Sequence, residues 1–321
     1  MKVSKRTLLC IAMLSSFGAT AQTNSFPQKA ITLIAPFAPG SSSDVTARAI
    51  AQKISASLGQ SVIVENRPGA NGGIGMRAVA NSKADGYTLA VATVSSTVVP
   101  PIISKQVPFD LFKQFTPVAT MANTPLVITV PGDSPIQNVS DLVAEVKKAP
   151  KTMSYGDSAG LYRIVMEALN TNAGIDLLGI PFKGSAQAMT EMLAGRLHVN
   201  PDALGAAASM LQSKRIKAIA VLGTNRTPSL PDVPTMQEQG YKDFVFNGWL
   251  GLLAPAGTPP EHVAVLHKAI EDAVQTPEIQ ALYQRLGMEP TVLSPQAYAE
   301  AMKKDSAWYS NVAQRAGIEK Q

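Results

Sequence analysis

The stretch Ile31–Leu58, ITLIAPFAPGSSSDVTARAIAQKISASL, predicts a strand, a tight loop and a helix in direct succession. Its first residues, ITLIA, form a short apolar run, which is typical of a strand buried on both faces of a parallel sheet. Pro36 and Pro39 exclude a helix in the loop, and Gly40 permits a backbone conformation that strains other residues. After Asp44, apolar residues recur every three or four positions, which predicts an amphipathic helix.

The loop of this unit is rich in groups that can bind an anion. Ser41, Ser42, Ser43 and Asp44 supply side-chain oxygens that can cap the helix start. The free N–H groups of the helix's first turn lie beyond the end of the strand, where anionic ligands bind in open α/β sheets. The loop is therefore consistent with an anion site, and equally with an ordinary connection in any α/β domain.

The N-terminus has the layout of a secretory signal peptide, which we expect to cover residues 1–21. Three basic residues precede the apolar run Leu8–Phe17, and the small residues Ala19–Ala21 form a cleavage site. The mature chain would begin near Gln22. It would have no disulfide, because the only cysteine, Cys10, would be removed.

Charge and composition restrict the class of protein. The 28 basic residues of the full sequence fall to 25 without the signal, against 23 acidic ones, so the net charge drops from +5 to +2. So small a charge gives no support for a nucleic-acid partner. With 45% hydrophobic and 16% charged residues, the chain should be a soluble globular protein, and its 321 residues suffice for two domains. We expect a monomer.

After the opening unit, strand and helix patterns alternate in two series. The first series has strands at 61–65 and 87–93 with a helix near 74–81; the second has strands at 152–155, 178–181, 197–201, 216–222 and 245–253, and a helical tail follows. Alternation of this kind predicts parallel sheets and two α/β lobes. Polar loops follow several strands, at Gly40–Ser43, Ser95–Thr97, Gly156–Gly160 and Asp202.

One of these loops matches a catalytic motif. Gly156–Gly160, GDSAG, fits the G-x-S-x-G nucleophile elbow, and lies between a predicted strand and a predicted helix. A serine triad also needs a histidine. The candidates after the signal are His198, His262 and His267, and the last two lie on an amphipathic helix where we expect them to face solvent. A serine hydrolase that uses Ser158 remains an alternative.

Other cofactor and metal motifs are weak or missing. Gly73–Ala78 fits the looser dinucleotide pattern G-x-G-x-x-A, but Asn66–Gly72 separates it from its strand, and no acid follows the next strand to hold a ribose. The sequence has no phosphate-binding P-loop and no Cys/His cluster. We therefore expect no cofactor and no metal. A site built from hydroxyls and backbone N–H groups suits binding better than bond-making.

Six segments occur in an order and spacing that are hard to obtain by chance: PFAPGSSSDVTAR, VENRPGANGGIG, ADGYTLAVAT, IPFKGSAQAMTEMLAGRL, RTPSLPDVPTMQEQG and WLGLLAPAGTPP. Together they resemble the solute receptors of tripartite tricarboxylate transporters, often called Bug proteins. The resemblance implies a two-lobed, type II-like periplasmic binding protein, with two open α/β domains joined by crossing strands. Residues 22–124 and 248–321 would form lobe 1, and residues 125–247 would form lobe 2.

The resemblance also implies a function without enzymatic activity. The protein would be a periplasmic receptor that captures a small organic carboxylate between its lobes and presents it to the membrane subunits of a transporter. A ligand sensor subunit with the same fold is a further alternative. By motif match, the ligand would be held by Phe37, Pro39, Gly40, Ser41, Ser42, Ser95, Ser96, Gly156, Ser158, Ala159, Gly160 and Asp202. In relatives, the acid at the position of Asp202 can hold a ligand's amino or hydroxyl group.

Two departures from the family pattern concern the ligand. Ser41 stands where a second glycine usually follows Pro-Gly, and Tyr162-Arg163 stand where a histidine is common. If Arg163 faces the ligand, its charge would favour a diacid. The departures leave the predicted fold unchanged.

Overall fold

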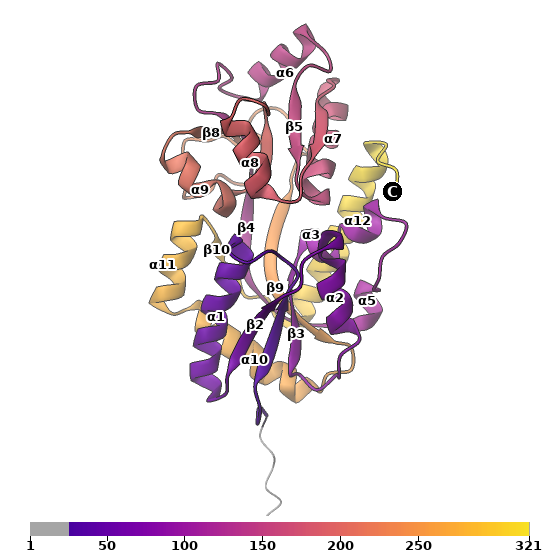
Figure 1. Ribbon diagram of the computed structural model, residues 1–321, viewed down its shortest axis with the longest axis vertical. Helices are drawn as coiled ribbons and strands as arrows, with labels where there is room; N and C mark the ends of the chain where they lie inside the picture. The colour runs from indigo at the N-terminus through magenta and orange to yellow at the C-terminus, as the bar shows by residue number, and fades with distance from the viewer. Residues whose placement is uncertain (1–25, 321) are drawn as a thin grey trace, which may run out of the picture.

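The computed structural model describes residues 26–320, which form two α/β lobes stacked along the long axis of the molecule (Figure 1). Two long strands, β4 (Phe115–Pro131) and β9 (Asn247–Pro255), run side by side between the lobes. This arrangement confirms the crossing strands expected from the sequence. The predicted signal peptide lies outside the described residues, and the predicted lobe boundaries stay a prediction.

The first lobe is built on a mixed sheet. Its other elements are β1 (Ile31–Ala35), α1 (Ser42–Leu58), β2 (Val62–Asn66), η1 (Ala70–Gly72), α2 (Gly73–Ala80), β3 (Thr88–Thr93), α3 (Val94–Thr97), α4 (Pro100–Ile103), α5 (Leu111–Gln114), α10 (Pro260–Val274), α11 (Pro277–Leu286) and β10 (Glu289–Pro290). The strand order is β10-β4-β9-β3-β1-β2. β1 is parallel to β2 and β3, but β9 is antiparallel to both β3 and β4. The parallel pairing predicted from the alternating pattern holds for β1, β2 and β3, whereas β9 returns from the other lobe and inserts antiparallel between β3 and β4.

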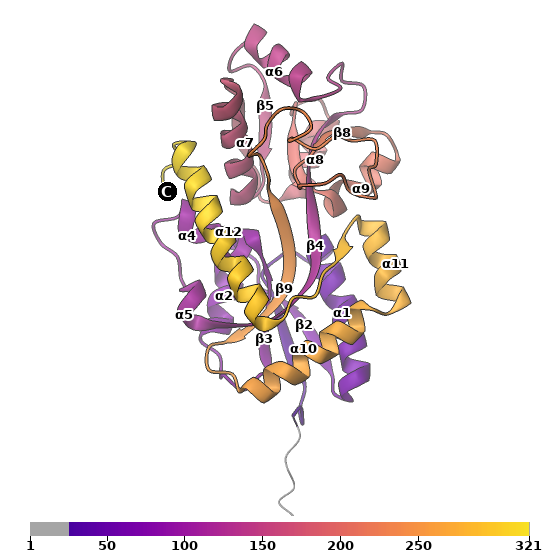
Figure 2. The same ribbon diagram turned by 180° about the vertical axis from the view of Figure 1, so that it is seen from behind.

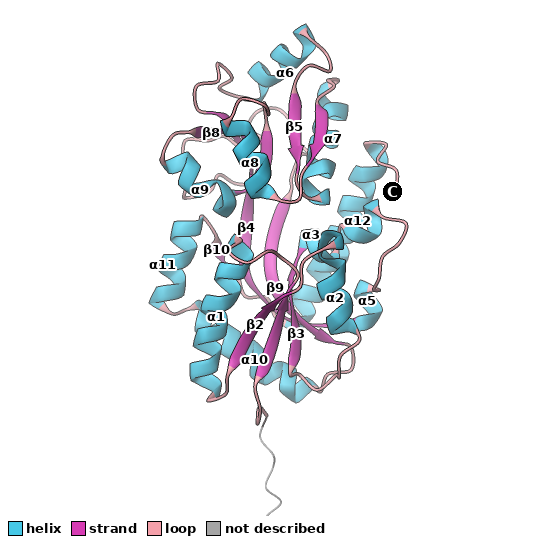
Figure 3. Cartoon of the chain, viewed as in Figure 1, coloured by secondary structure: helices cyan, strands magenta, loops and turns pink. Residues whose placement is uncertain are grey.

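The opening unit folds as its sequence predicts. Ser41 caps α1 by accepting a hydrogen bond from the N–H of Asp44, and Gly59 ends the helix in the left-handed conformation at φ 63°. Ile50 and Ile54 on the apolar face of α1 are fully buried against the sheet. The polar loop is therefore held at the end of β1 that faces the second lobe (Figure 3).

The second lobe uses the far half of β4. Its elements are α6 (Val139–Lys148), β5 (Ser154–Asp157), α7 (Gly160–Ala173), β6 (Leu178–Pro181), α8 (Ser185–Leu193), β7 (Asn200–Ala203), α9 (Leu204–Gln212) and β8 (Ile216–Val221). β4 pairs with β9 as far as Pro125, and from Leu126 onward it pairs antiparallel with β7 and β8. The change of partner falls beside a proline, which cannot donate a ladder hydrogen bond. β5 pairs with β6 in parallel, and its Tyr155 forms a single parallel bridge with Val199, immediately before β7.

The C-terminal helix α12 (Pro295–Arg315) runs from the first lobe past β9 toward α7 (Figure 2). It is hydrogen-bonded to β9 and to the segment before it. The Trp249 indole donates to Asp305 at 2.8 Å, and the Tyr309 hydroxyl donates to the Asn247 carbonyl at 2.7 Å. One hydrophobic cluster extends through residues of both lobes. Among residues 26–320, no helix combines the length and apolar character needed to cross a membrane.

Candidate functional site

Many polar groups of the loop after β1 hydrogen-bond to one another or to the start of α1. Gly40, at φ 81°, donates its N–H to the Asp44 carboxylate at 2.9 Å, and Asp44 in turn donates its own N–H to the Ser41 hydroxyl. Asp44 is 2% exposed and also accepts from Asn66 at 2.7 Å. Although burial alone raises the pKa of Asp44, hydrogen bonds from Asn66, Gly40 and Arg48 bring it below its usual range. The N-terminus of α1 thus already carries an anion of its own.

Of the two serines after β3, Ser96 has a structural hydroxyl and Ser95 has a more accessible one. Ser96 is buried, and its hydroxyl accepts from the Thr93 N–H at 3.0 Å within a reciprocal cap of α3. A Cβ on Gly72 would lie 2.7 Å from the Cβ of Ser96, so the space around Ser96 is filled. Ser95 is only half-buried. Of the two predicted serines, Ser95 is the better placed for contact with a ligand.

The loop after β5 packs tightly on both sides. A Cβ on Gly156 would overlap the Asn200 side-chain oxygen, and a Cβ on Gly160 would overlap Ile103 of α4 in the first lobe. The Ser158 hydroxyl is buried and has no hydrogen-bond partner among the described residues. Ala159, at the N-cap of α7, provides no side-chain cap. The loop therefore meets the first lobe and leaves polar groups without protein partners.

Asp202 lies at the end of β7 and is 1% exposed. One carboxylate oxygen accepts from the Tyr162 hydroxyl at 3.1 Å and from the Ala203 N–H at 2.8 Å. The other accepts from the Ser185 hydroxyl and from Asn200 at 3.2 Å. Burial raises the pKa of Asp202 to about 6, although all four hydrogen bonds act in the opposite direction. Sequence reasoning identified Asp202 but gave no role to Tyr162 or Ser185.

The predicted residues of the two lobes converge. A Cβ on Gly205 in α9, three residues after Asp202, would lie 3.4 Å from the Cβ of Ser42 and 2.8 Å from the Leu286 carbonyl. On the other side, Gly160 packs against α4, which begins four residues after Ser96. The segment that follows β1 therefore meets the one that follows β7, and the segment that follows β5 meets α4, which lies beyond β3, where the lobes touch.

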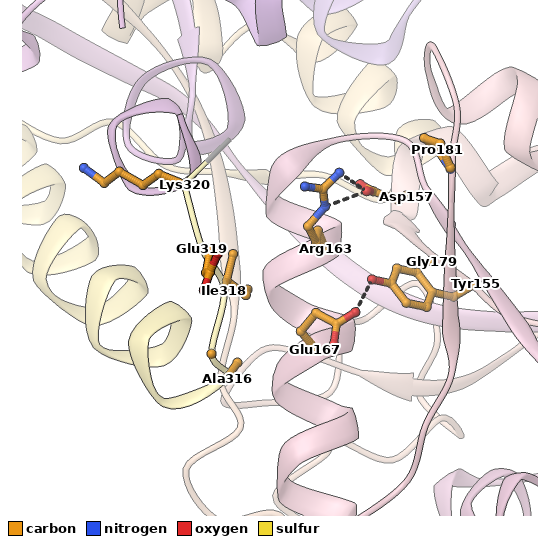
Figure 4. A pocket seen from close by; sticks show the side chains of 11 residues that line it. Tyr155, Asp157, Arg163, Glu167, Gly179, Pro181, Ala316, Ile318, Glu319 and Lys320 are labelled. Atoms are coloured by element: carbon orange, nitrogen blue, oxygen red, sulfur yellow. Dashed lines mark hydrogen bonds and ion pairs between the residues drawn. The ribbon is translucent and has the colours of Figure 1, made fainter. Parts of the chain in front are cut away.

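Arg163 is directed elsewhere. Its Nε donates to the Asp157 carboxylate at 2.6 Å, and Asp157 is 8% exposed. Burial raises the pKa of Asp157 in spite of this ion pair. Beside the pair lies an open pocket of about 560 Å³ (Figure 4), lined by Tyr155, Asp157, Arg163, Glu167, Gly179, Pro181, Ala316, Gly317, Ile318, Glu319 and Lys320. Arg163 thus faces the C-terminal segment, while its neighbour Tyr162 contacts Asp202.

The three histidines are engaged away from Ser158. His198 Nδ1 accepts from the Ser154 N–H at 3.1 Å, and the Nδ1 atoms of His262 and His267 lie 3.0 and 3.1 Å from backbone carbonyls. His262 and His267 are half-buried, so they face solvent only in part. The hydrolase alternative therefore lacks its base. Within residues 26–320, no group of His, Cys, Asp and Glu side chains could hold a metal.

Two lobes joined by a pair of crossing strands, with the strand-end loops of both lobes meeting at their contact, define a binding protein of the periplasmic type. A family model described as "Tripartite tricarboxylate transporter family receptor" matches residues 46–318. A UPF0065 protein of Bordetella bronchiseptica is 35% identical over 314 residues, covering 98% of this chain and 93% of that one. The chain belongs to the tripartite tricarboxylate transporter receptor family, and it is a solute-binding receptor rather than an enzyme.

Solved structures of similar proteins support the same assignment. The periplasmic binding protein BugD is 32% identical, with a TM-score of 0.84, and the match covers 92% of this chain and 100% of BugD. An R. palustris protein described with adipate is 31% identical, with a TM-score of 0.88 over 92% of this chain and 100% of its own. MatC from Rhodopseudomonas palustris, with bound malate, is 27% identical, with a TM-score of 0.83, and the match covers 89% of this chain and 99% of MatC. The α/β periplasmic binding protein fold predicted from the sequence is confirmed.

Proposed function

We propose that the chain is exported to the periplasm, captures a small organic carboxylate between its lobes, and presents it to the membrane subunits of a tripartite transporter. Dicarboxylates of four to six carbons are the first candidates, since relatives are described with malate and with adipate. The observation that carries the proposal is the contact between Ser42, at the start of α1, and Gly205 in the first turn of α9, three residues after Asp202.

The chemistry of this region suits a carboxylate. The N-caps of α7, α8 and α9 are Ala159, Gly184 and Ala203, none of which provides a side-chain cap. The first-turn N–H groups of a helix have no acceptor within the helix, and each helix N-terminus favours a negative charge by ~0.3–1 kcal/mol. The buried hydroxyl of Ser158 is a further donor without a protein partner. Lobe closure would keep water from these groups and strengthen each hydrogen bond.

Calorimetric titration of the purified mature protein tests the proposal. Malate, succinate and adipate are compared with butyrate and hexanoate, which match succinate and adipate in length but carry one carboxylate. A bound acid at 100 times its Kd should add ~2.7 kcal/mol to the free energy of unfolding. Failure of every acid to bind would refute the proposal. Uptake of the bound acid by cells with and without the receptor then separates transport from sensing.

A further inference from the structure

The buried carboxylate of Asp202 joins the first turns of three helices. Its partners are Tyr162 in the first turn of α7, Ser185 at the start of α8, and the N–H of Ala203 immediately before α9. Asn200 of β7 supplies the fourth hydrogen bond at 3.2 Å. The network also closes on itself, since the Tyr162 hydroxyl accepts from the Ala203 N–H at 3.0 Å. One side chain therefore fixes the relative positions of α7, α8 and α9.

These four donors are neutral, which distinguishes this carboxylate from the buried carboxylates of Asp44 and Asp157. Asp44 is paired with Arg48 and Asp157 with Arg163, whereas the named partners of Asp202 carry no charge. A buried carboxylate needs its donors to offset the loss of hydration, and its negative charge is compensated here by three helix N-termini. The same three helices lack side-chain caps. Asp202 reaches α7 and α8 only through side-chain hydroxyls, so it joins these helix starts and leaves their first-turn N–H groups available to a ligand.

With 1% exposure and four protein donors, Asp202 has no free acceptor position for a ligand. Its influence on a ligand must pass through the helices that it holds. Displacing a binding group by as little as 1 Å can cost a large factor in the strength of an interaction. The alignment of the uncapped helix ends therefore depends on two hydroxyls, those of Tyr162 in α7 and Ser185 in α8, which donate to Asp202.

We propose that Tyr162 and Ser185 are positioning residues of the carboxylate site: through the Asp202 carboxylate, they align the N-terminal turns of α7, α8 and α9 on the ligand. This inference depends on the proposed function, because it concerns the same site. It assigns the two hydroxyls to the geometry of the receptor and not to direct contact with the ligand.

The test is a double-mutant cycle with Tyr162→Phe, Ser185→Ala and the double variant, titrated with malate and with adipate. Each single variant should lower the affinity about tenfold, because a displacement of the helix turns by a fraction of an ångström weakens their contacts with the ligand. The double variant should lose less than the product of the two, because both hydroxyls act through one carboxylate. Ser185→Thr keeps the hydroxyl and should restore the affinity.

Matched controls are Tyr241→Phe and Ser213→Ala, which remove the same groups at other places in the second lobe; Ser213 bonds only to carbonyls of its own helix. Binding is measured well below the melting temperature of every variant, so a loss of stability alone leaves the affinity unchanged. Wild-type affinity in the single variants, or strictly multiplicative losses in the double variant, would overturn the inference. If the wild type binds neither malate nor adipate but another acid, the cycle is run with that acid; if it binds no acid, the proposed function falls and the inference falls with it.

Discussion

Arg163 and Asp157 form an ion pair, 2.6 Å from Nε to Oδ2, beside a pocket that the C-terminal segment also lines, whereas the neighbouring Tyr162 donates to Asp202. Consecutive helix positions are about 100° apart around the axis, so Tyr162 and Arg163 contact different surroundings. The positive charge of Arg163, which would favour a second ligand carboxylate, is already compensated by Asp157. Selection between monoacids and diacids therefore has to come from other groups.

Replacement of Arg163 by alanine should lower stability without changing ligand preference. The variant leaves Asp157 buried and unpaired, which should lower the free energy of unfolding by about 1–3 kcal/mol, less than for a fully buried pair because Arg163 is 26% exposed. Urea denaturation measures this. Arg196→Ala, which breaks an exposed pair with Glu191, is the control and should leave stability almost unchanged, because water screens that pair. A changed ratio of succinate to butyrate affinity would show that Arg163 reaches the ligand.

Ser158→Ala should weaken carboxylate binding while leaving stability equal or higher. The hydroxyl is buried without a described partner, so its removal costs the folded state no hydrogen bond. Thr227→Val is a matched control, since the Thr227 hydroxyl is equally buried and unpartnered but lies outside the predicted site. Calorimetry should show reduced affinity for the first variant only. Labelling of wild-type Ser158 by a fluorophosphonate probe would return the hydrolase to consideration.

The stability contribution of Asp202 should fall as the pH rises. Burial raises its pKa from 3.8 to about 6, so the folded protein binds this proton more tightly than the unfolded chain does. The contribution is therefore complete below about pH 4 and is lost as the pH passes through about 6, a change of roughly 3 kcal/mol. The free energy of unfolding of the wild type, relative to Asp202→Asn, should decrease from pH 4 to pH 7. An increase over that range would contradict the assignment.

Asp202→Ala also separates the two roles considered for this residue. From the sequence, we predicted that Asp202 holds a ligand hydroxyl or amino group, and this role stays a prediction. Saturation of the carboxylate by four donors leads us to expect equal affinity losses for malate and for succinate, which lacks the hydroxyl. A selective loss of malate affinity would instead support direct contact.

Gly160→Ala should hinder the approach of the two lobes. The added Cβ would overlap Ile103 across their contact, whereas a Cβ on Gly223 would meet nothing closer than 3.5 Å. We expect Gly160→Ala to have a larger radius of gyration by small-angle X-ray scattering with ligand present, and a weaker affinity. Gly223→Ala is the control and should match the wild type in both.

The sequence predicted the local units well, because hydrophobic period and caps act over a few residues. The Ser41 cap and the buried face of α1 are where the pattern places them. The mixed strand order was not predictable in this way, since the position of β9 between β3 and β4 depends on partners more than 100 residues away. The same holds for the site: Asp202 follows a recognisable strand, but its bond to Tyr162 spans 40 residues and leaves no local signal.

The position of β9 also has a consequence for how the chain acquires its structure. β9 lies between β3 and β4, yet it follows them after the whole of α6 to β8. As the chain emerges from its N- to its C-terminus, the sheet of the first lobe stays incomplete until residues 247–255 arrive, whereas the second lobe's strands and helices are contiguous. The second lobe can thus fold first and bring the two halves of the other together. The edges of β3 and β4 stay unpaired meanwhile, so this interval is when the newly made chain is most exposed to aggregation.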